Sequence, residues 1–219
     1  MKKLLLLLLT TLFASGCATT AIPPVSGESL QPIKTERVAV KYTLAAKKIN
    51  YVETIYRVLW LETNTSSQDF SGIWSPDQDI TGYVVSRLRQ QGIRAESVYD
   101  LVNPSLLVRG GTDVNDAGFS ALSEALRIGG IRYLFELTAM NIDGNAIGYG
   151  MVTVQATPNA RMIDLRTNKV VWTTKLFHSE VYQFGGDLKK LEENSMSKTK
   201  EGLRAGINKI DFLSLWGIK

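Results

Sequence analysis

The chain has 219 residues, a formal net charge of +4, one cysteine and one histidine. Its length fits one domain, and its 44% hydrophobic and 21% charged residues are an ordinary globular balance. Lys and Arg form no stripe, which excludes the usual pattern of a nucleic-acid binder. Without Lys2 and Lys3 of the leader described below, 23 basic residues stand against 21 acidic ones, so the remaining charge is near +2.

The first sixteen residues have the layout of a secretory signal peptide. Lys2 and Lys3 give the start a positive charge, and residues 4–14 form an apolar run that only two threonines interrupt. The run is too short to span a bilayer permanently. Small residues then lead to Cys17, the only cysteine of the chain. An unpaired cysteine in an exported protein needs an explanation.

Residues 14–17 resemble the lipobox of bacterial lipoproteins, with Ala14 where lipoboxes more often carry Leu. The resemblance implies that the signal is cut before Cys17, that the thiol receives a diacylglycerol, and that the new amine is acylated, for example with palmitate. Ala18 in place of Asp implies an outer-membrane lipoprotein whose domain faces the periplasm. Several acyl chains give stable attachment, whereas one chain anchors only marginally. The alternative is an ordinary signal peptide with an incidental cysteine.

Residues 17–36 are predicted to be a lipidated and flexible tether, because they contain Pro23, Pro24, Gly27 and Pro32 and lack an apolar period. Residues 37–219 are predicted to be a single periplasmic domain. No segment after Cys17 approaches the roughly 18 to 20 apolar residues of a transmembrane helix.

Within the domain, the pattern of apolar and turn residues predicts alternating strands and helices. The firmest prediction is a helix over residues 76–91, where Ser75 and Gln78 suggest a capping box and Gly92 a left-handed end. Further helices are predicted from Asn115 or Asp116 to Gly129 and over residues 187–210, with an apolar tail (212–216) that docks on the core. Strands are predicted over residues 37–44, 55–61, 93–98, 131–139, 148–157, 160–165 and 170–177, a loop over 64–72, a hairpin turn at 143–144, and a short helix or loop over 100–109.

This order of elements predicts an α/β (α+β) fold, with a mixed β-sheet, helices packed on it and a long C-terminal helix. Residues 160–172 are predicted to form a strand that ends in Asp164, a turn through Thr167 and Asn168, and a second strand. This arrangement resembles a segment of envelope lipoproteins of the CsgG and TolB N-terminal-domain class. The resemblance covers about residues 37–216. CsgG proteins carry two additional membrane hairpins, for which the connection over residues 140–160 leaves no room. The resemblance therefore implies the periplasmic part alone and no secretion channel.

The sequence presents no catalytic set, no metal site and no cofactor motif. A triad or a zinc site needs histidine together with other groups, and His178 is the only histidine. The acidic pairs 77/79 and 192/193 are explained by a helix first turn and by a solvated helix face. The glycines of residues 148–150 lack the following helix of a phosphate loop. We therefore predict a protein that is not an enzyme.

Four aromatic residues, Tyr56, Trp60, Phe70 and Trp74, gather in a region with few helix signals. They are candidates for a partner or ligand surface, because aromatic side chains dominate such surfaces. Core packing is the alternative, and it is the favoured one.

Three hypotheses of function follow. The first is a non-enzymatic lipoprotein that binds an envelope protein or further copies of itself, as a component of an envelope assembly or secretion system. The second is a ligand- or lipid-binding accessory lipoprotein of a transporter. The third is a hydrolase of envelope polymers, which requires an acidic residue with a raised pKa in a cleft.

Overall fold

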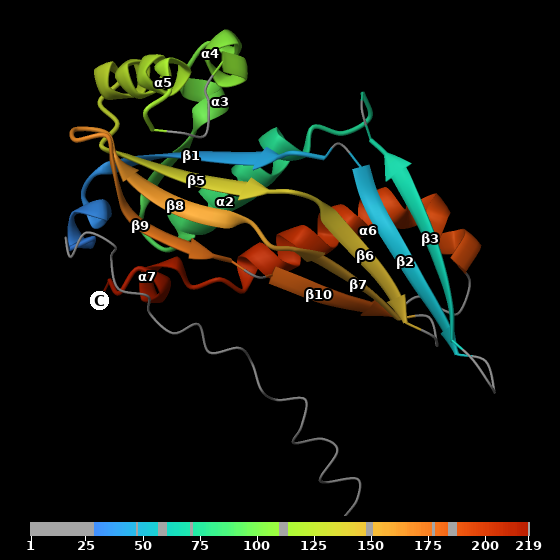
Figure 1. Cartoon of the computed structure of the whole chain (residues 1–219). Helices are drawn as coiled ribbons and strands as arrows, with labels where there is room; N and C mark the ends of the chain where they lie inside the picture. The colour runs from blue at the N-terminus through green and yellow to red at the C-terminus, as the bar shows by residue number, and fades with distance from the viewer. Residues whose placement is uncertain are drawn as a thin grey trace, which may run out of the picture.

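The structure is a computed structural model, and it describes residues 29–46, 48–56, 61–70, 72–109, 114–147, 151–176, 178–183 and 188–218. The strands of these residues form two five-stranded sheets (Figure 1). The first contains β1 (Arg37–Leu44), β4 (Arg94–Ser97), β5 (Tyr133–Ala139), β8 (Asn159–Asp164) and β9 (Lys169–Lys175), in the order β4-β1-β5-β8-β9. The second contains β2 (Lys48–Tyr56), β3 (Leu61–Asp69), β6 (Ile142–Ile147), β7 (Met151–Ala156) and β10 (His178–Gln183), in the order β10-β7-β6-β2-β3.

β1 is the centre of the parallel part of the first sheet, with β4 on one side and β5 on the other. Residues 38–42 of β1 and 133–137 of β5 are buried without interruption. Such continuous burial is typical of parallel strands that have helices on both faces. β8 and β9 add an antiparallel hairpin, and Asn168 in its turn has a φ of 53°, which Asn tolerates better than most residues. The predicted mixed sheet is confirmed.

Four pairs of consecutive strands each place one strand in either sheet, and the four pairs have the same spatial order in both sheets. Three residues separate β1 from β2, and two separate β5 from β6, β7 from β8, and β9 from β10. The second sheet therefore continues the first across a bend, which Figure 1 shows at the middle of the molecule. Only the edge strand changes, from β4 in the first sheet to β3 in the second.

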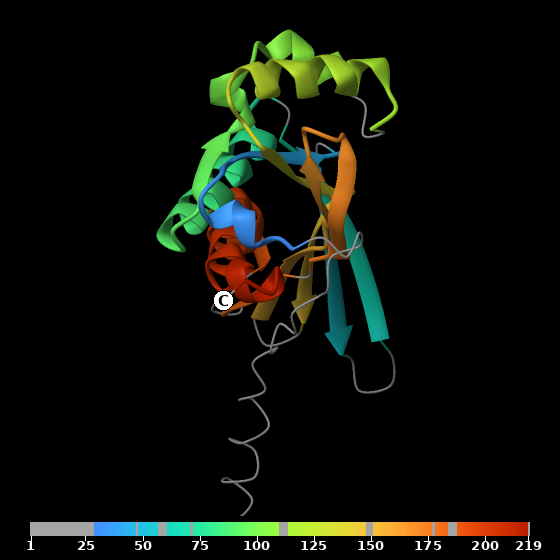
Figure 2. The same ribbon diagram turned by 90° about the vertical axis from the view of Figure 1, so that its left-hand side faces the viewer.

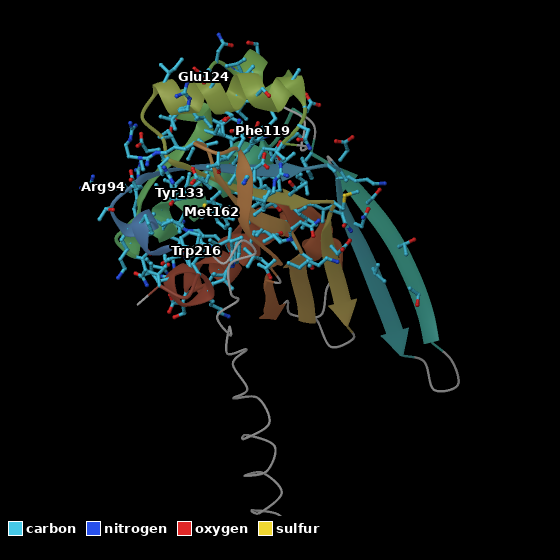
Figure 3. The ribbon with its side chains drawn as sticks, turned by 60° about the vertical axis from the view of Figure 1, so that its left-hand side comes forward. Arg94, Phe119, Glu124, Tyr133, Met162 and Trp216 are labelled. Atoms are coloured by element: carbon cyan, nitrogen blue, oxygen red, sulfur yellow. The ribbon has the colours of Figure 1, made fainter. Side chains whose placement is uncertain are left out.

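Helices cover both faces of the first sheet (Figures 1 and 2). One face carries α2 (Pro76–Gln90), α7 (Phe212–Leu215) and the C-terminal part of α6 (Leu188–Asn208), a helix that also packs against β7 and β10 of the second sheet. The other face carries α3 (Val98–Leu101), α4 (Pro104–Arg109) and α5 (Ala117–Ile128). In Figure 3, Phe119 lies on the side of α5 toward the sheet and Glu124 on its outer side, as the amphipathic pattern of this helix requires.

The larger core lies between the sheet and the helices α2, α6 and α7. The aromatic rings of Phe135, Trp172, Phe212 and Trp216 meet there at centroid distances of 5.2 to 6.4 Å. Trp216 is 2% exposed, which confirms that the apolar tail docks on the core. The smaller core lies under α5.

The helix α2 confirms the firmest prediction from the sequence. It spans Pro76–Gln90, and Gly92 follows with a φ of +83°. Ser75 is the N-cap residue, but its side chain makes no capping hydrogen bond. The start of α2 is held instead by tertiary contacts, which are described below. The apolar stripe of Ile80, Val84 and Leu88 is fully buried against the sheet.

Three predictions of secondary structure, one loop, one strand and one turn, are wrong. The predicted loop over residues 64–72 contains most of β3. Its sequence is polar, and it forms a strand because its backbone pairs with β2. The strand predicted over residues 55–61 is the end of β2 and the start of β3, with residues 57–60 outside the described residues. The turn predicted at Asp143 and Gly144 lies inside β6, where both residues pair with β2 and β7.

The structure also moves the start of the packed domain from Arg37 to Leu30. A 3-10 helix, η1 (Gln31–Lys34), precedes β1, and Leu30 and Ile33 are 3% and 0% exposed. The two apolar side chains join the larger core, so residues 30–36 are not part of a flexible tether. Among the described residues, no helix has the length and apolar character that crossing a membrane requires.

Candidate functional site

The four aromatic candidates fall into two groups. Trp60 and the side chain of Tyr56 lie outside the described residues, as does Cys17. Phe70 and Trp74 are 1% and 6% exposed, and their rings meet edge to face with centroids 5.2 Å apart. Both belong to the larger core, as the core-packing alternative predicts. They also line a cavity, so the prediction of a ligand surface stays open.

The cavity has a volume of about 320 Å³ and opens at the carboxyl end of β1. It lies where β1 ends, α2 begins and α3 passes. Its lining comes from Leu44, Phe70, Gly72, Trp74, Ser75, Pro76, Asp77, Gln78 and Tyr99. In sheets of this kind, ligands bind outside the carboxyl ends of the parallel strands. The position of the cavity is therefore that of a binding site in an open α/β sheet.

Asp77 connects the end of β1 to the first turn of α2. Its Oδ1 accepts a hydrogen bond of 2.7 Å from the backbone N–H of Leu44, and its carbonyl accepts one of 2.6 Å from the hydroxyl of Thr81. The hydroxyl of Thr81 in turn accepts the N–H of Tyr42 at 2.9 Å. These bonds bring a carboxylate to the wall of the cavity, at a helix N-terminus that favours negative charge.

Trp74 is held in place from three sides. Its Nε1 donates to Oδ2 of Asp79 at 2.6 Å, and Nζ of Lys200 on α6 lies 5.2 Å from the centre of its ring. The same lysine lies 4.0 Å from Oδ2 of Asp79. A cation over an aromatic face is stabilised by the ring quadrupole. The indole is thus fixed by Phe70, Asp79 and Lys200.

Tyr99 also lines the cavity, and its hydroxyl donates to the carbonyl of Tyr42 at 3.3 Å. Burial raises the pKa of Tyr99 well above its usual value, and the negative charge of Asp77 raises it further. The same two causes raise the pKa of Tyr42. Both phenols are therefore neutral at physiological pH, and the field of Asp77 reaches both.

The acidic side chains of the described residues bear on the hydrolase hypothesis. Among the described residues that line the cavity, Asp77 is the only carboxylate, whereas glycoside hydrolysis uses a pair. Among the described residues no group of three His, Cys, Asp or Glu side chains is placed to hold a metal ion. The side chains of His178, Glu192 and Glu193 lie outside the described residues. Tyr99 could not be found from its local sequence, because it lies in the short helix α3 and reaches the cavity only through tertiary packing.

A second surface is the outer edge of β3. This strand ends the second sheet and pairs only with β2 among the described residues. Thr63, Thr65, Ser67 and Asp69 are exposed along it. Figure 1 shows β3 at the margin of the molecule, away from α2 and α5. Its nine residues contain no proline, lysine or arginine, the residues with which proteins commonly protect such edges.

Comparison with known proteins gives similar folds and no family. No family model matches the chain, and no curated protein matches it. The PelC dodecamer from Paraburkholderia phytofirmans is 15% identical, with a TM-score of 0.43 over 87% of this chain and 94% of that one. Protein XCC0632 from Xanthomonas campestris is 8% identical, with a TM-score of 0.44 over 93% and 88%. Lipoprotein GNA1162 from Neisseria meningitidis is 15% identical, with a TM-score of 0.38 over 76% and 99%.

Likenesses at these identities and TM-scores carry no argument about activity or partners. None of these three structures is described as a CsgG or TolB protein, so that resemblance stays a prediction.

Proposed function

We propose that the chain is a non-enzymatic lipoprotein of the outer membrane, anchored through lipid on Cys17 with its domain facing the periplasm. Its domain binds an envelope protein partner, or further copies of itself, as a component of an envelope assembly or secretion system. The lipobox resemblance supports the anchor. The open edge of β3 is the observation that supports partner binding.

The edge of β3 suits strand addition by a partner. Every second residue of an edge strand turns its backbone N–H and C=O outward, where a further strand can pair with them. Nine residues give a pairing length above the usual five or six residues of a strand. The exposed threonines favour extended structure, and the strand contains no lysine or arginine.

Proline scanning of β3 in the full-length protein tests this proposal. Consecutive residues of a strand direct their N–H groups to opposite sides, so one of the two variants Thr65→Pro and Ser66→Pro removes an outward donor and the other an inward one. A photo-crosslinking amino acid at Thr63 reports on contact in intact cells. We expect discrete crosslinked products whose yield falls at least about tenfold in the variant that keeps the parent melting temperature.

A photo-crosslinker at Ser120, which is exposed on α5, is the matched control and is expected to give no such products. The proposal is wrong if position 63 gives no discrete product, or if the product persists unchanged in the proline variant that still folds.

The cavity at the end of β1 favours a second candidate, a ligand-binding accessory lipoprotein. Its volume lies at the lower end of the range of small-molecule sites. The cavity lies at the C-terminal end of β3, where Phe70 follows Asp69, and the edge proposed for partner binding runs along the strand itself.

A further inference from the structure

A basic residue lies at the same end of every strand of the first sheet, within two residues of the strand terminus. β1 runs parallel to β4 and β5, so these three strands begin at this end, where the backbone N–H of Arg132 donates to the carbonyl of Arg37. β8 ends at the same place and β9 begins there. The five residues that define this basic end of the sheet are, in the order of the strands, Arg94, Arg37, Arg132, Arg166 and Lys169.

The opposite end of the first sheet lacks this pattern. Within two residues of that end, β1, β4, β5 and β8 carry no lysine or arginine, and β9 carries one, Lys175. Adjacent strands lie about 4.8 Å apart, so the basic end is roughly 19 Å wide. Its residues come from separate segments of the chain, and for this reason the sequence itself shows no basic stripe.

Acidic side chains offset only the middle of the basic end. They form the pairs Arg37–Glu96, Arg132–Asp164 and Arg166–Glu36. The two outer residues, Arg94 and Lys169, are exposed and make no ion pair among the described residues. The carboxyl end of α2 lies at the same end of the sheet, and Arg87 and Arg89 in its last turn offset the helix dipole there. Two positive charges therefore stay available at the two margins of the basic end.

An exposed apolar side chain lies beside these charges. Ile128, the last residue of α5, is 77% exposed. The guanidinium of Arg37 donates to the carbonyl of Gly129, the next residue, so α5 ends against the basic end. Protein surfaces bind membranes through apolar side chains together with cations that attract anionic headgroups. The basic end has this composition.

The chain also enters the domain at the basic end. η1 directly precedes β1, and Figure 1 shows it at the same end of the first sheet as the turn between β8 and β9. Twelve residues, 18–29, separate Cys17 from the buried Leu30. Fully extended, they keep Leu30 within roughly 45 Å of a lipid on Cys17. Such a tether makes contact between the domain and the membrane an intramolecular step, for which weak contacts suffice.

From this coincidence of charge, exposed apolar surface and chain entry, we propose that the basic end docks on an anionic phospholipid surface, the leaflet that holds the lipid of Cys17. Arg94 and Lys169 attract the headgroups, and Ile128 enters the interface. The inference rests on the proposed lipid anchor and adds an orientation to it. The second sheet points away from the membrane, which leaves the edge of β3 open to a partner.

A fluorophore at Ile128 tests this orientation in the full-length lipoprotein, purified from membranes and reconstituted into lipid nanodiscs. Because lipid occupies the thiol of Cys17, Ile128→Cys supplies the single free thiol for labelling with NBD. We expect NBD emission to rise at least about twofold when about 30% phosphatidylglycerol is added to phosphatidylcholine nanodiscs. Met140→Cys is the matched control, since Met140 is 68% exposed and follows the opposite end of β5. Its emission is expected not to change.

Two pairs of charge variants then test the basic end itself, each combined with Ile128→Cys. Arg94→Gln with Lys169→Gln removes the two outer cations and is expected to reduce the rise in emission to less than about half. Lys48→Gln with Lys175→Gln removes two exposed lysines near the other end of the sheet and is expected to keep the full rise. About 0.5 M NaCl should suppress the rise in the parent, because salt screens exposed charges.

Mass spectrometry of the same sample reports the acyl chains on Cys17. An unmodified Cys17 would overturn the anchor and, with it, the docking that rests on it. On a lipidated protein, equal emission from position 128 in both kinds of nanodisc, or equal rises at positions 128 and 140, would overturn the docking alone. A rise that Arg94→Gln with Lys169→Gln leaves unchanged would contradict the role of the basic end.

Discussion

Three charged side chains lie in one row across the face of the first sheet that α5 covers. Glu136 on β5 stands opposite Lys41 on β1 and opposite Arg161 on β8. Its oxygens lie 3.2 Å from Nζ of Lys41 and 2.5 Å from a guanidinium nitrogen of Arg161. Glu136 is 2% and Lys41 5% exposed. Burying such charges is costly unless each has partners, so the row depends on its central carboxylate.

Glu136→Gln is therefore expected to lower the free energy of unfolding by about 3 kcal/mol, because it removes the carboxylate that the buried ammonium of Lys41 contacts. Glu124→Gln is the control, since the Glu124–Arg127 pair on α5 has both side chains about half exposed. Its expected cost is below about 1 kcal/mol. Urea unfolding of the two variants measures the difference. Equal costs would show that the buried row does not stabilise the fold.

The ion pair between Arg37 and Glu96 makes the free energy of unfolding depend on pH in the acidic range. Two hydrogen bonds from Arg37, at 2.7 and 2.9 Å, together with its charge hold the pKa of Glu96 below its usual value of 4.5. The stability that this pair contributes is complete above the pKa of the unfolded chain and is lost as the pH falls through the lower pKa of the folded state. The parent should lose more unfolding free energy than Glu96→Gln between about pH 5 and pH 3. Parallel acid profiles would contradict this assignment.

At the scale of single elements, predictability depends on whether the signal is local. α2 could be predicted because Pro76, the four-residue spacing of its apolar side chains and Gly92 all lie within its own sequence. β3 could not, because Leu61–Asp69 is polar on both faces and only its pairing with β2 makes it a strand. The same holds for Gly144, a turn former in isolation that tertiary pairing places inside β6.

The two glycines of the α2 region give opposite expectations. Gly82 lies inside the helix with no atom within 4 Å of an added Cβ, so Gly82→Ala should raise the free energy of unfolding by about 0.5 to 1 kcal/mol. Gly92 has equal space but a φ of +83°, so Gly92→Ala should lower it by about 1 kcal/mol. Denaturant unfolding of both variants checks the pair, and the same sign for both would contradict the backbone argument.

At the scale of the whole molecule, the cavity lies where β1 and β3 end, and the outer edge of β3 runs along the second sheet. The helices α2, α5 and α7 lie on the first sheet, α6 also packs against β7 and β10 of the second, and β3 lies at the margin of the second sheet (Figure 1). The fold class could be predicted from the order of elements. The cavity could not, because Phe70, Asp77 and Tyr99 come together only through the packing of α2 and α3 around the end of β1. Phe70 and Trp74 could be recognised from the sequence as aromatic candidates, but the carboxylate of Asp77 in the same cavity could not.

The most direct test of an anchored binding domain is membrane fractionation of the full-length protein and of its Cys17→Ala variant. Lipid on Cys17 is the attachment that the lipobox resemblance implies, and several acyl chains make it stable. The parent protein is expected in the outer-membrane fraction, and the variant in the soluble periplasmic fraction or as uncleaved precursor in the inner membrane. A Cys17→Ala protein that remains in the outer-membrane fraction like the parent would contradict the account.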